Sequence, residues 1–191
     1  MSGVMRARRA APGDAAAIAA IYNQGIEDRI ATFETRPRSA AEIAGWFDGA
    51  HPIVVIEEEG RVIAFAATFL YRPRKCYDGI AETSLYVARE YRGRGAGRLA
   101  MTALIRAAEE AGFWKLISRV FPENEASLKL IESLGFRAVG TYQKHGRLDG
   151  VWRDVVIVER LIPTNLGPQP ATDNGGRQER SHRGGHRDDR S

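Results

Sequence analysis

Hydrophobic spacing in the first third of the chain changes twice. Residues 4–9 predict a short strand. Asp14 is a predicted helix N-cap, and the apolar positions after it recur at helical spacing up to Ile26. Ser39 and Glu42 form a capping box that opens a second helix. We therefore expect one strand followed by two helices.

The middle of the chain is dominated by β-branched and aromatic runs. Residues 53–56 and 62–71 predict a hairpin, and residues 80–88 predict a third strand. A glycine-rich turn then leads into a helix that begins near Arg98 and ends at Gly112.

The pattern closes with strands around one more helix. Residues 116–120 predict a strand, and the next helix is capped by Asn124 and stopped by Gly135. Residues 136–143 and 151–161 predict a strand pair around a loop that contains residues 144–146. The order β-α-α-β-β-β-α-β-α-β-β mixes hairpins with helical crossovers, so we predict an α/β (α+β) fold with a mixed sheet flanked by helices.

Composition narrows the classes of protein that fit. The chain has 191 residues, and its 28 basic and 24 acidic side chains are interspersed, which favours a solvated mixed surface over a nucleic-acid-binding stripe. Its apolar runs are all shorter than the roughly 20 residues of a membrane helix. A single cysteine, Cys76, excludes an intrachain disulfide, and we expect a cytoplasmic protein.

The last part of the chain differs from the rest. Residues 163–191 are rich in proline, glycine and charged side chains, and Leu166 is their only large apolar residue. Such a segment buries too little surface to offset the entropy of ordering. We predict one domain at 1–162 and a disordered tail at 163–191.

The glycine-rich turn has the clearest chemical meaning. Residues 92–97 (Arg-Gly-Arg-Gly-Ala-Gly) lie between a predicted strand and a predicted helix. This placement directs free backbone N–H groups and the positive end of a helix dipole at one point, which suits a pyrophosphate. A dinucleotide fingerprint would need a glycine at Arg98, and a Walker loop would need Gly-Lys-Ser/Thr. We therefore predict a phosphate-bearing cofactor.

Two blocks resemble the GCN5-related N-acetyltransferases (GNAT): residues 85–97, which are similar to their acetyl-CoA loop, and residues 124–127 with 134–136. The resemblance covers residues 4–162 and implies a mostly antiparallel sheet with acetyl-CoA as donor. Further blocks are similar to the phosphinothricin acetyltransferase group, which includes arsinothricin and methionine sulfone or sulfoximine acetyltransferases; they lie at 21–23, 32–33, 77–78, 82–87, 144–146 and 152–154. These enzymes acetylate the α-amine of glutamate-like analogues, which confers resistance, and are typically homodimers.

The resemblance also implies how the cofactor is held. The backbone of residues 85–87 would pair with the pantetheine arm, and the N–H of Val87 would donate to the thioester oxygen. Asn124 would touch the cofactor arm, serve only as a helix N-cap, or do both. The implied cofactor-binding residues are Leu85, Tyr86, Val87, Arg92, Gly93, Arg94, Gly95, Ala96, Gly97, Arg98 and Asn124.

Glu82 is the candidate general base. It matches the catalytic glutamate of the group, and an acidic residue among strand formers is unusual. The alternative is a solvent-facing strand residue. Many members of the superfamily carry a tyrosine acid where this chain has Ile131, so water, Tyr86 or Tyr142 would have to protonate the leaving thiolate.

The candidate substrate-binding residues are Phe33, Arg72, Arg74, Tyr77 and His145. Guanidinium groups suit carboxylate, phosphinate or arsinate oxygens, although Arg72 and Arg74 would also fit a solvated basic loop. Phe33 could equally be a core residue, and His145 a surface residue. We predict no metal site, because two of the four histidines lie in the tail.

Three functions remain open at this point. The first is acetylation of a small amino-acid substrate, which Glu82 and the basic residues Arg72 and Arg74 favour. The second is acetylation of a protein N-terminus or lysine by the same fold. The third is a non-catalytic acyl-CoA sensor that keeps the glycine-rich turn without turnover.

Overall fold

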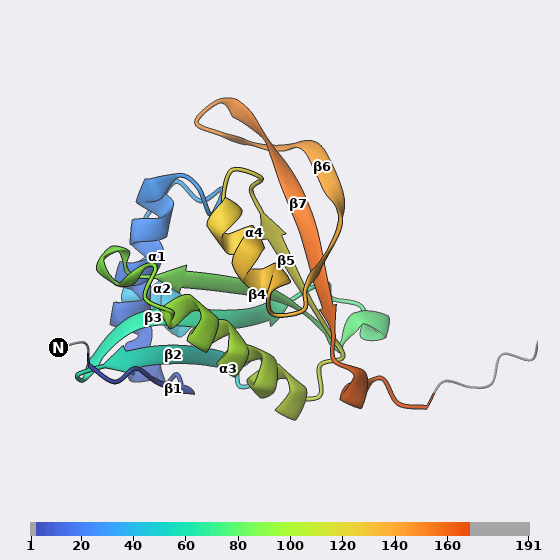
Figure 1. Cartoon of the computed structure of the whole chain (residues 1–191), viewed down its shortest axis with the longest axis horizontal. Coiled ribbons are helices and arrows are strands. Elements are labelled where there is room, and N and C mark those ends of the chain that lie inside the picture. Colours follow the sequence, from blue (N-terminus) through green and yellow to red (C-terminus); the bar gives the residue numbers. More distant parts are fainter. Residues whose placement is uncertain (1–2, 169–191) are drawn as a thin grey trace, which may run out of the picture.

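The computed structural model describes residues 3–168, and its elements follow the predicted order (Figure 1). Short 3-10 turns lie at Pro12–Asp14, Lys75–Tyr77, Arg89–Tyr91 and Pro163–Asn165. The helices and strands are β1 (Arg6–Arg9), α1 (Ala15–Asp28), α2 (Ala40–Ala44), β2 (Ile53–Glu58), β3 (Arg61–Leu70), β4 (Ile80–Val87), α3 (Ala96–Glu110), β5 (Lys115–Val120), α4 (Glu125–Glu132), β6 (Arg137–Leu148) and β7 (Val151–Leu161).

The strands form one sheet in the order β1-β2-β3-β4-β5-β7-β6. Among the described strands, β4 and β5 pair in parallel, and every other neighbouring pair is antiparallel. This confirms the mixed, mostly antiparallel sheet flanked by helices. The parallel pair follows from the helical crossover through α3, whereas hairpins produce antiparallel neighbours.

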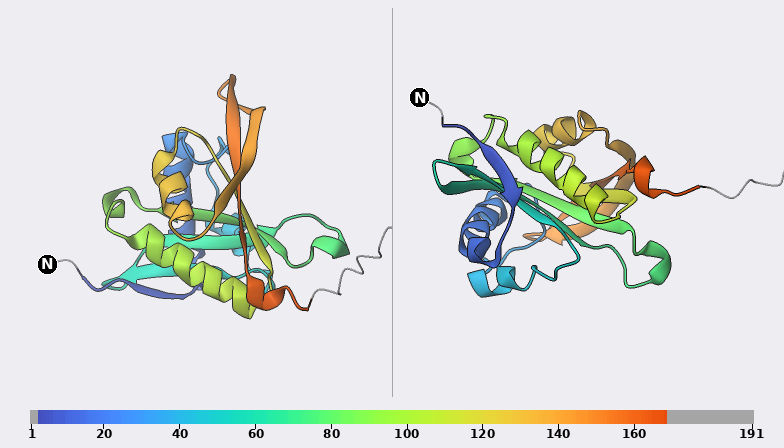
Figure 2. Two further views of the ribbon diagram at one scale, coloured as in Figure 1. Left: turned by 45° about the vertical axis from the view of Figure 1, so that its right-hand side comes forward. Right: turned by 90° about the horizontal axis from the view of Figure 1, so that it is seen from below.

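Helices cover both faces of the sheet, with α1 and α2 on one side and α3 and α4 on the other (Figure 2). Ile18 and Phe65 belong to the core under α1, whereas Leu104 and Leu116 belong to the core under α3. Successive side chains of a strand point to opposite faces. The even-numbered residues of β4, such as Tyr86, therefore face α1, and the odd-numbered residues face α3.

A gap opens between β4 and β5 in the middle of the sheet. Their ladder ends at the pair Glu82 and Ile117, although both strands continue beyond it. At the end of the ladder, the Ser118 hydroxyl donates to the Thr83 carbonyl oxygen at 3.1 Å. The two strands then diverge, which leaves one edge of β4 open.

The β6–β7 hairpin stands out from the rest of the molecule (Figure 2). The predicted loop between residues 143 and 151 is too long, because β6 continues to Leu148 and the chain turns only at Asp149 and Gly150, with φ angles of 48° and 80°. Asp-Gly is a typical two-residue hairpin turn. The segment at 144–146 is instead part of a bulge, where Asp154 Oδ1 accepts the Lys144 N–H at 2.7 Å.

Two predicted helix starts have different outcomes. The capping box is confirmed, since Ser39 Oγ accepts the N–H of Glu42 at 3.2 Å, but α2 is only five residues long. Asp14 directly precedes α1 without capping it through its side chain. Its carboxylate instead accepts the Ala11 N–H at 2.8 Å and pairs with Arg8 at 2.8 Å. These two partners use the hydrogen-bonding capacity of the carboxylate that a helix cap would need.

The packed structure continues past the predicted domain end at residue 162. Asn165 Nδ2 donates to the carbonyl oxygens of Glu109 and Phe113 at 2.8 and 2.9 Å, which holds the turn Pro163–Asn165 against the end of α3. The rest of the predicted tail, from residue 169, lies outside the described residues. Within residues 3–168, none of the helices has the length and apolar character needed to cross a membrane.

Candidate active site

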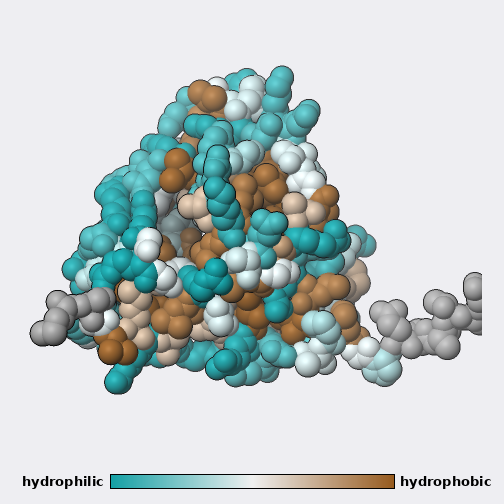
Figure 3. All heavy atoms as spheres, viewed as in Figure 1, coloured by the Kyte–Doolittle hydropathy of each residue, from teal (hydrophilic) through white to brown (hydrophobic). Residues whose placement is uncertain are grey.

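A cavity of about 400 Å³ lies between α1 and α4, at the open end of the gap between β4 and β5. It forms the hollow between these helices in Figure 3. Nine of the eleven predicted cofactor-binding residues line it: Leu85, Tyr86, Val87, Arg92, Gly93, Gly95, Gly97, Arg98 and Asn124.

The glycine-rich turn forms one wall of this cavity. Gly93 and Gly95 have φ angles of 74° and 91°, which side chains disfavour, and a Cβ on either would meet no atom within 4 Å. Helix α3 begins at Ala96, directly after them, and the first N–H groups of a helix have no intrahelical partner. Open space in front of free N–H groups and a positive helix end fits an anion.

The open edge of β4 forms a second wall. The Ala88 N–H donates to the Ile63 carbonyl oxygen of β3 at 2.9 Å, and such bonds alternate along an antiparallel pair. The backbone of Tyr86 therefore faces β3, whereas Leu85 and Val87 direct their N–H and C=O groups into the gap. An extended amide chain can bind to such an edge as an added strand would.

The three arginines of the turn point in different directions. Arg92 and Arg98 line the cavity, and Arg98 Nη2 donates to Ser133 Oγ at 2.8 Å. Arg94 instead pairs with the buried Glu58 of β2 at 2.8 Å and does not line the cavity. Ala96 is also outside it, because its side chain is buried in the core between α3 and the sheet. Of the three arginines predicted to bind the cofactor, two therefore line the cavity.

An acidic residue that the sequence analysis missed also lines the cavity. Asp28, at the end of α1, pairs with Arg89 at 2.8 Å and with Arg92 at 2.7 Å. Burial alone would raise the pKa of Asp28, but hydrogen bonds from these two guanidinium groups lower it below the usual value. Arg92 Nε also donates to the Val87 carbonyl oxygen at 3.1 Å.

Asn124 caps α4 and lines the cavity at once. Its Oδ1 accepts the N–H of Ser127 at 3.2 Å, and its Nδ2 donates to the Ile30 carbonyl oxygen at 3.3 Å. The side chain thus joins α4 to the segment after α1, across the mouth of the gap. The helix cap is observed, and a contact with cofactor remains compatible with it.

A smaller cavity of about 60 Å³ continues from the large one toward the narrow end of the gap. Leu85, Tyr86 and Asn124 line both cavities. The small cavity also reaches Ser84 of β4 and Arg119 of β5. A molecule that extends from the glycine-rich turn along β4 would therefore end near these residues.

Glu82 lies beside this narrow end and belongs to an ion pair. Arg119 Nη1 donates to Glu82 Oε1, and their side chains are 38% and 27% exposed. Ile117 is the neighbour of Glu82 across the ladder, so Glu82, Ile117 and Arg119 share the face covered by α1 and α2. Arg119 was not predicted as a site residue, because a single basic residue in a strand has no distinctive sequence pattern.

Phe33 lies on the same face, between β5 and the hairpin. Its ring packs against Phe121 at 4.8 Å, and a Cβ on Gly146 would come within 2.8 Å of it. Only a glycine lets the β6 backbone approach this closely. The structure thus brings Phe33 next to the bulge that carries His145, whose own ring contacts Tyr142 at 4.9 Å.

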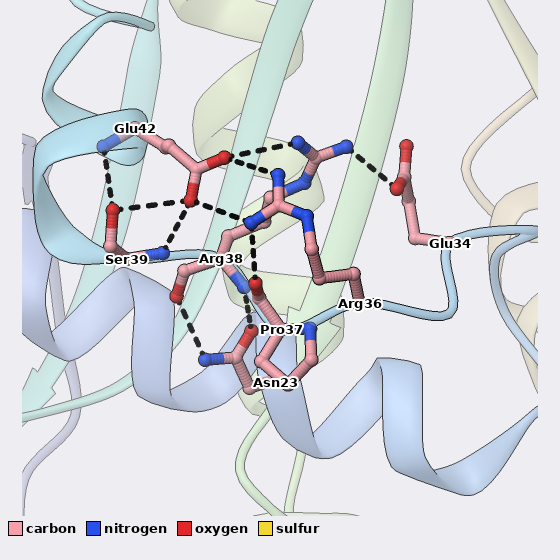
Figure 4. Close-up of polar contacts among 7 residues, drawn as sticks. All are labelled: Asn23, Glu34, Arg36, Pro37, Arg38, Ser39 and Glu42. Atoms are coloured by element: carbon pink, nitrogen blue, oxygen red, sulfur yellow. Dashed lines mark hydrogen bonds and ion pairs between the residues drawn. The ribbon is translucent and has the colours of Figure 1, made fainter.

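A polar network holds the segment that carries Phe33 (Figure 4). Asn23 of α1 exchanges two hydrogen bonds with the backbone of Arg38, at 3.0 and 2.8 Å. Arg38 also pairs with Glu34 at 2.6 Å, and Arg36 pairs with Glu42 at 2.6 Å. These contacts join the connection to both α1 and α2, and they hold the chain directly after Phe33.

The other predicted substrate residues lie apart from Phe33. Arg72 and Arg74 are exposed in the connection before β4, and the Tyr77 ring packs against Tyr71 at 5.7 Å. This connection precedes β4, whereas the glycine-rich turn follows it. The two ends of an eight-residue strand such as β4 are about 23 Å apart. The structure does not bring these three residues together with Phe33 and His145.

The candidate proton donors differ in their surroundings. Tyr86 is packed against Tyr22 and Phe65, its hydroxyl donates to the Ala31 carbonyl oxygen at 3.4 Å, and burial raises its pKa. A raised pKa makes it a weaker acid toward a thiolate. Tyr142 is 53% exposed on the hairpin, and Ile131 is a core residue. Within residues 3–168, no group of three or more His, Cys, Asp or Glu side chains is placed to hold a metal ion.

Known proteins share this sequence pattern and fold. Residues 18–136 match the model of the acetyltransferase (GNAT) family. The phosphinothricin N-acetyltransferase of Streptomyces viridochromogenes is 31% identical over 169 residues, which cover 85% of this chain and 91% of that protein. The L-methionine sulfoximine/L-methionine sulfone acetyltransferase of Pseudomonas aeruginosa is 31% identical over 167 residues, with 84% and 97% covered.

A solved structure agrees with these relatives. The crystal structure of a GNAT superfamily phosphinothricin acetyltransferase from Sinorhizobium meliloti, in complex with AcCoA, has a TM-score of 0.80 and 29% identity to this chain. The match covers 91% of this chain and 95% of that one.

Proposed function

The chain belongs to the acetyltransferase (GNAT) family, and from that premise we propose that it acetylates the α-amine of a glutamate-like amino-acid analogue. It is an N-acetyltransferase with acetyl-CoA as donor. The proposed substrates are phosphinothricin, arsinothricin and methionine sulfone or sulfoximine. The observation that carries the proposal is the position of Glu82, beside the narrow end of a cleft whose open end fits a phosphate-bearing cofactor.

The cleft residues fit acetyl-CoA in two places. The N–H groups around Gly93 and Gly95 would hold the diphosphate, with Arg92 and Arg98 beside it. The Leu85 carbonyl and the Val87 N–H, which face the gap, would hold the amides of the pantetheine arm. When bound, the cofactor supplies an activated acetyl thioester. Of the two N–H groups that face the gap, that of Leu85 lies nearer to Glu82 than that of Val87, so the Leu85 N–H would stabilise the negative charge that develops on the acetyl oxygen.

Glu82 would act on the amine. The amine nitrogen attacks the acetyl carbon, the carbon–sulfur bond breaks, and the proton lost by the nitrogen passes to the Glu82 carboxylate. General-base help contributes roughly 10²–10⁴-fold, whereas holding two reactants together contributes about 7–11 kcal/mol. Positioning therefore dominates, and the enzyme without its base should retain measurable turnover. With Ile131 in the core, water would protonate the leaving thiolate.

The remaining parts of the proposal concern the setting of the site. Phe33 and His145 would contact the substrate from the hairpin side, and Arg72, Arg74 and Tyr77, which precede the strand that carries Glu82, would contact it from the start of β4. We propose a homodimer in the cytoplasm that confers resistance to such analogues. The exposed apolar side chains of the hairpin support the dimer: Val139, Tyr142, Val151 and Trp152.

A thiol-release assay tests the proposal. Purified protein with acetyl-CoA should release coenzyme A on addition of L-phosphinothricin or L-methionine sulfone. The panel should include a peptide with a free N-terminus and N-α-blocked lysine. Turnover of the peptide alone would replace the proposal with protein acetylation. Tight cofactor binding without thiol release on any amine would favour a sensor.

A further inference from the structure

Arg119 occupies a position from which it can reach both the base and the substrate. It lies two residues beyond Ile117, where the ladder between β4 and β5 ends, and it lines the small cavity. Its guanidinium is the partner of Glu82. Both side chains remain partly exposed, at 38% and 27%, and ion pairs in contact with solvent stabilise a protein little. Another anion can therefore take the place of Glu82 at low cost.

We propose that Arg119 selects free α-amino acids: the substrate α-carboxylate replaces Glu82 as the partner of Arg119, and this exchange frees Glu82 to take the proton of the amine. This inference rests on the proposed function, and it requires a substrate with a free α-carboxylate. Arg119 is thus a specificity-determining residue, because it couples the availability of the base to the presence of a carboxylate.

The contact between Glu82 and Arg119 restricts which anion can make the exchange. A molecule whose amine meets Glu82 can bring to Arg119 only a group attached close to that amine. In an α-amino acid this group is the α-carboxylate, which shares one carbon with the amine. A guanidinium can bind both of its oxygens. A peptide N-terminus has a neutral amide at this place, and a lysine side chain has a methylene group.

The exchange also keeps every charge paired. Before it, the Glu82 carboxylate and the Arg119 guanidinium neutralise each other. After it, the substrate carboxylate pairs with Arg119, and the substrate ammonium pairs with Glu82. Each charge therefore has a partner both before and after the exchange. A neutral amide at the same place would leave Glu82 bound to Arg119.

The experiment compares L-methionine sulfone with its α-carboxamide in the thiol-release assay. The wild type should prefer the acid, and Arg119→Gln should lower kcat/KM on the acid by about 10²-fold, as expected for a lost charged hydrogen-bonding partner. On the amide, kcat/KM should rise, because Glu82 is then no longer held by Arg119. Arg119→Lys should give an intermediate loss, because it keeps the charge without the two-pronged geometry. Arg137→Gln is the matched control, since Arg137 pairs with Glu159 outside both cavities.

The outcomes separate this inference from the proposed function. Equal losses on acid and amide, or no loss on either, would overturn the selection of the carboxylate while leaving amino-acid acetylation intact. A wild type that acetylates a peptide N-terminus but neither methionine sulfone compound would overturn both. A preference for the acid that disappears in Arg119→Gln and partly returns in Arg119→Lys supports the inference.

Discussion

The two ends of the cleft differ in which parts of the chain form them. At the cofactor end, the glycines, the open strand edge and the start of α3 come from one continuous segment, residues 85–98, and α1 and α4 complete the wall. The substrate end consists of side chains from β4, from β5 and from the connection after α1, among them Glu82, Arg119 and Phe33. A donor can thus be held by local chain geometry, whereas substrate choice depends on tertiary packing.

The largest expected effect separates chemistry from cofactor binding. Glu82→Gln should lower kcat by roughly 10²–10⁴-fold, because the base is lost while the reactants are still positioned. The acetyl-CoA affinity measured by calorimetry should stay within about twofold, since the cofactor end is unchanged. Glu159→Gln is the control: this carboxylate pairs with Lys115 at 2.9 Å, away from both cavities. A weaker affinity in Glu82→Gln would contradict the separation.

Two arginines of the glycine-rich turn should differ in what they support. Arg94→Ala should lower the free energy of unfolding by about 3 kcal/mol, because it leaves the carboxylate of Glu58, which is 6% exposed, without this partner. Arg98→Ala, in an exposed position, should change stability by about 0.5 kcal/mol or less and weaken acetyl-CoA binding instead. Urea unfolding and calorimetry on both variants measure this difference. Equal stability of the two variants would disprove the assignment of Arg94 to the fold.

Two glycines with similar backbones should differ in function. Gly95 and Gly60 have φ angles of 91° and 77°, and a Cβ on either meets no atom within 4 Å. Gly95→Ala and Gly60→Ala should each cost roughly 1 kcal/mol of stability, because alanine disfavours a positive φ. Only Gly95→Ala should also weaken acetyl-CoA binding, by about tenfold. A similar loss of affinity in Gly60→Ala would show that backbone strain, not the anion site, causes the effect.

The smallest expected effect concerns pH. The pKa of Asp28 is lowered in the folded protein, so its stabilising contribution is present above its unfolded pKa of about 3.9 and is lost as the pH falls through the folded pKa. Asp28→Asn should therefore be less stable than the wild type at pH 7, by about 1 kcal/mol. Urea titrations at pH 7, 5 and 3 should show the gap closing only at the lowest pH. A gap that widens on acidification would contradict the ion pairs with Arg89 and Arg92.

The sequence predicted the element order because apolar periodicity and turn residues are local signals. It made the turn of the last hairpin too long, because the residues from Lys144 to Leu148 were interpreted as loop, whereas they continue β6 up to the Asp149-Gly150 turn. The bulge depends on Asp154, ten residues away from Lys144 along the chain. Such a pairing becomes visible only when the register of the two strands is known.

The candidate site shows the same difference between local sequence signals and contacts that depend on the fold. The residues of the cofactor end were predicted because they are contiguous, except that Arg94 turns toward Glu58, which is 36 residues earlier in the chain. Arg119 and Asp28 were missed, since an arginine in a strand and an aspartate at a helix end have no distinctive pattern. Their importance comes from partners that only the folded chain brings close: Glu82 for one, and Arg89 with Arg92 for the other.

A crystal structure of the complex with acetyl-CoA would test the division of the cleft most directly. We predict that the diphosphate binds the N–H groups of the turn at residues 93–98, that the amides of the arm bond to the backbone of Leu85 and Val87, and that the acetyl group ends near Glu82. A cofactor bound through side chains elsewhere, or with its acetyl group away from Glu82, would contradict the account.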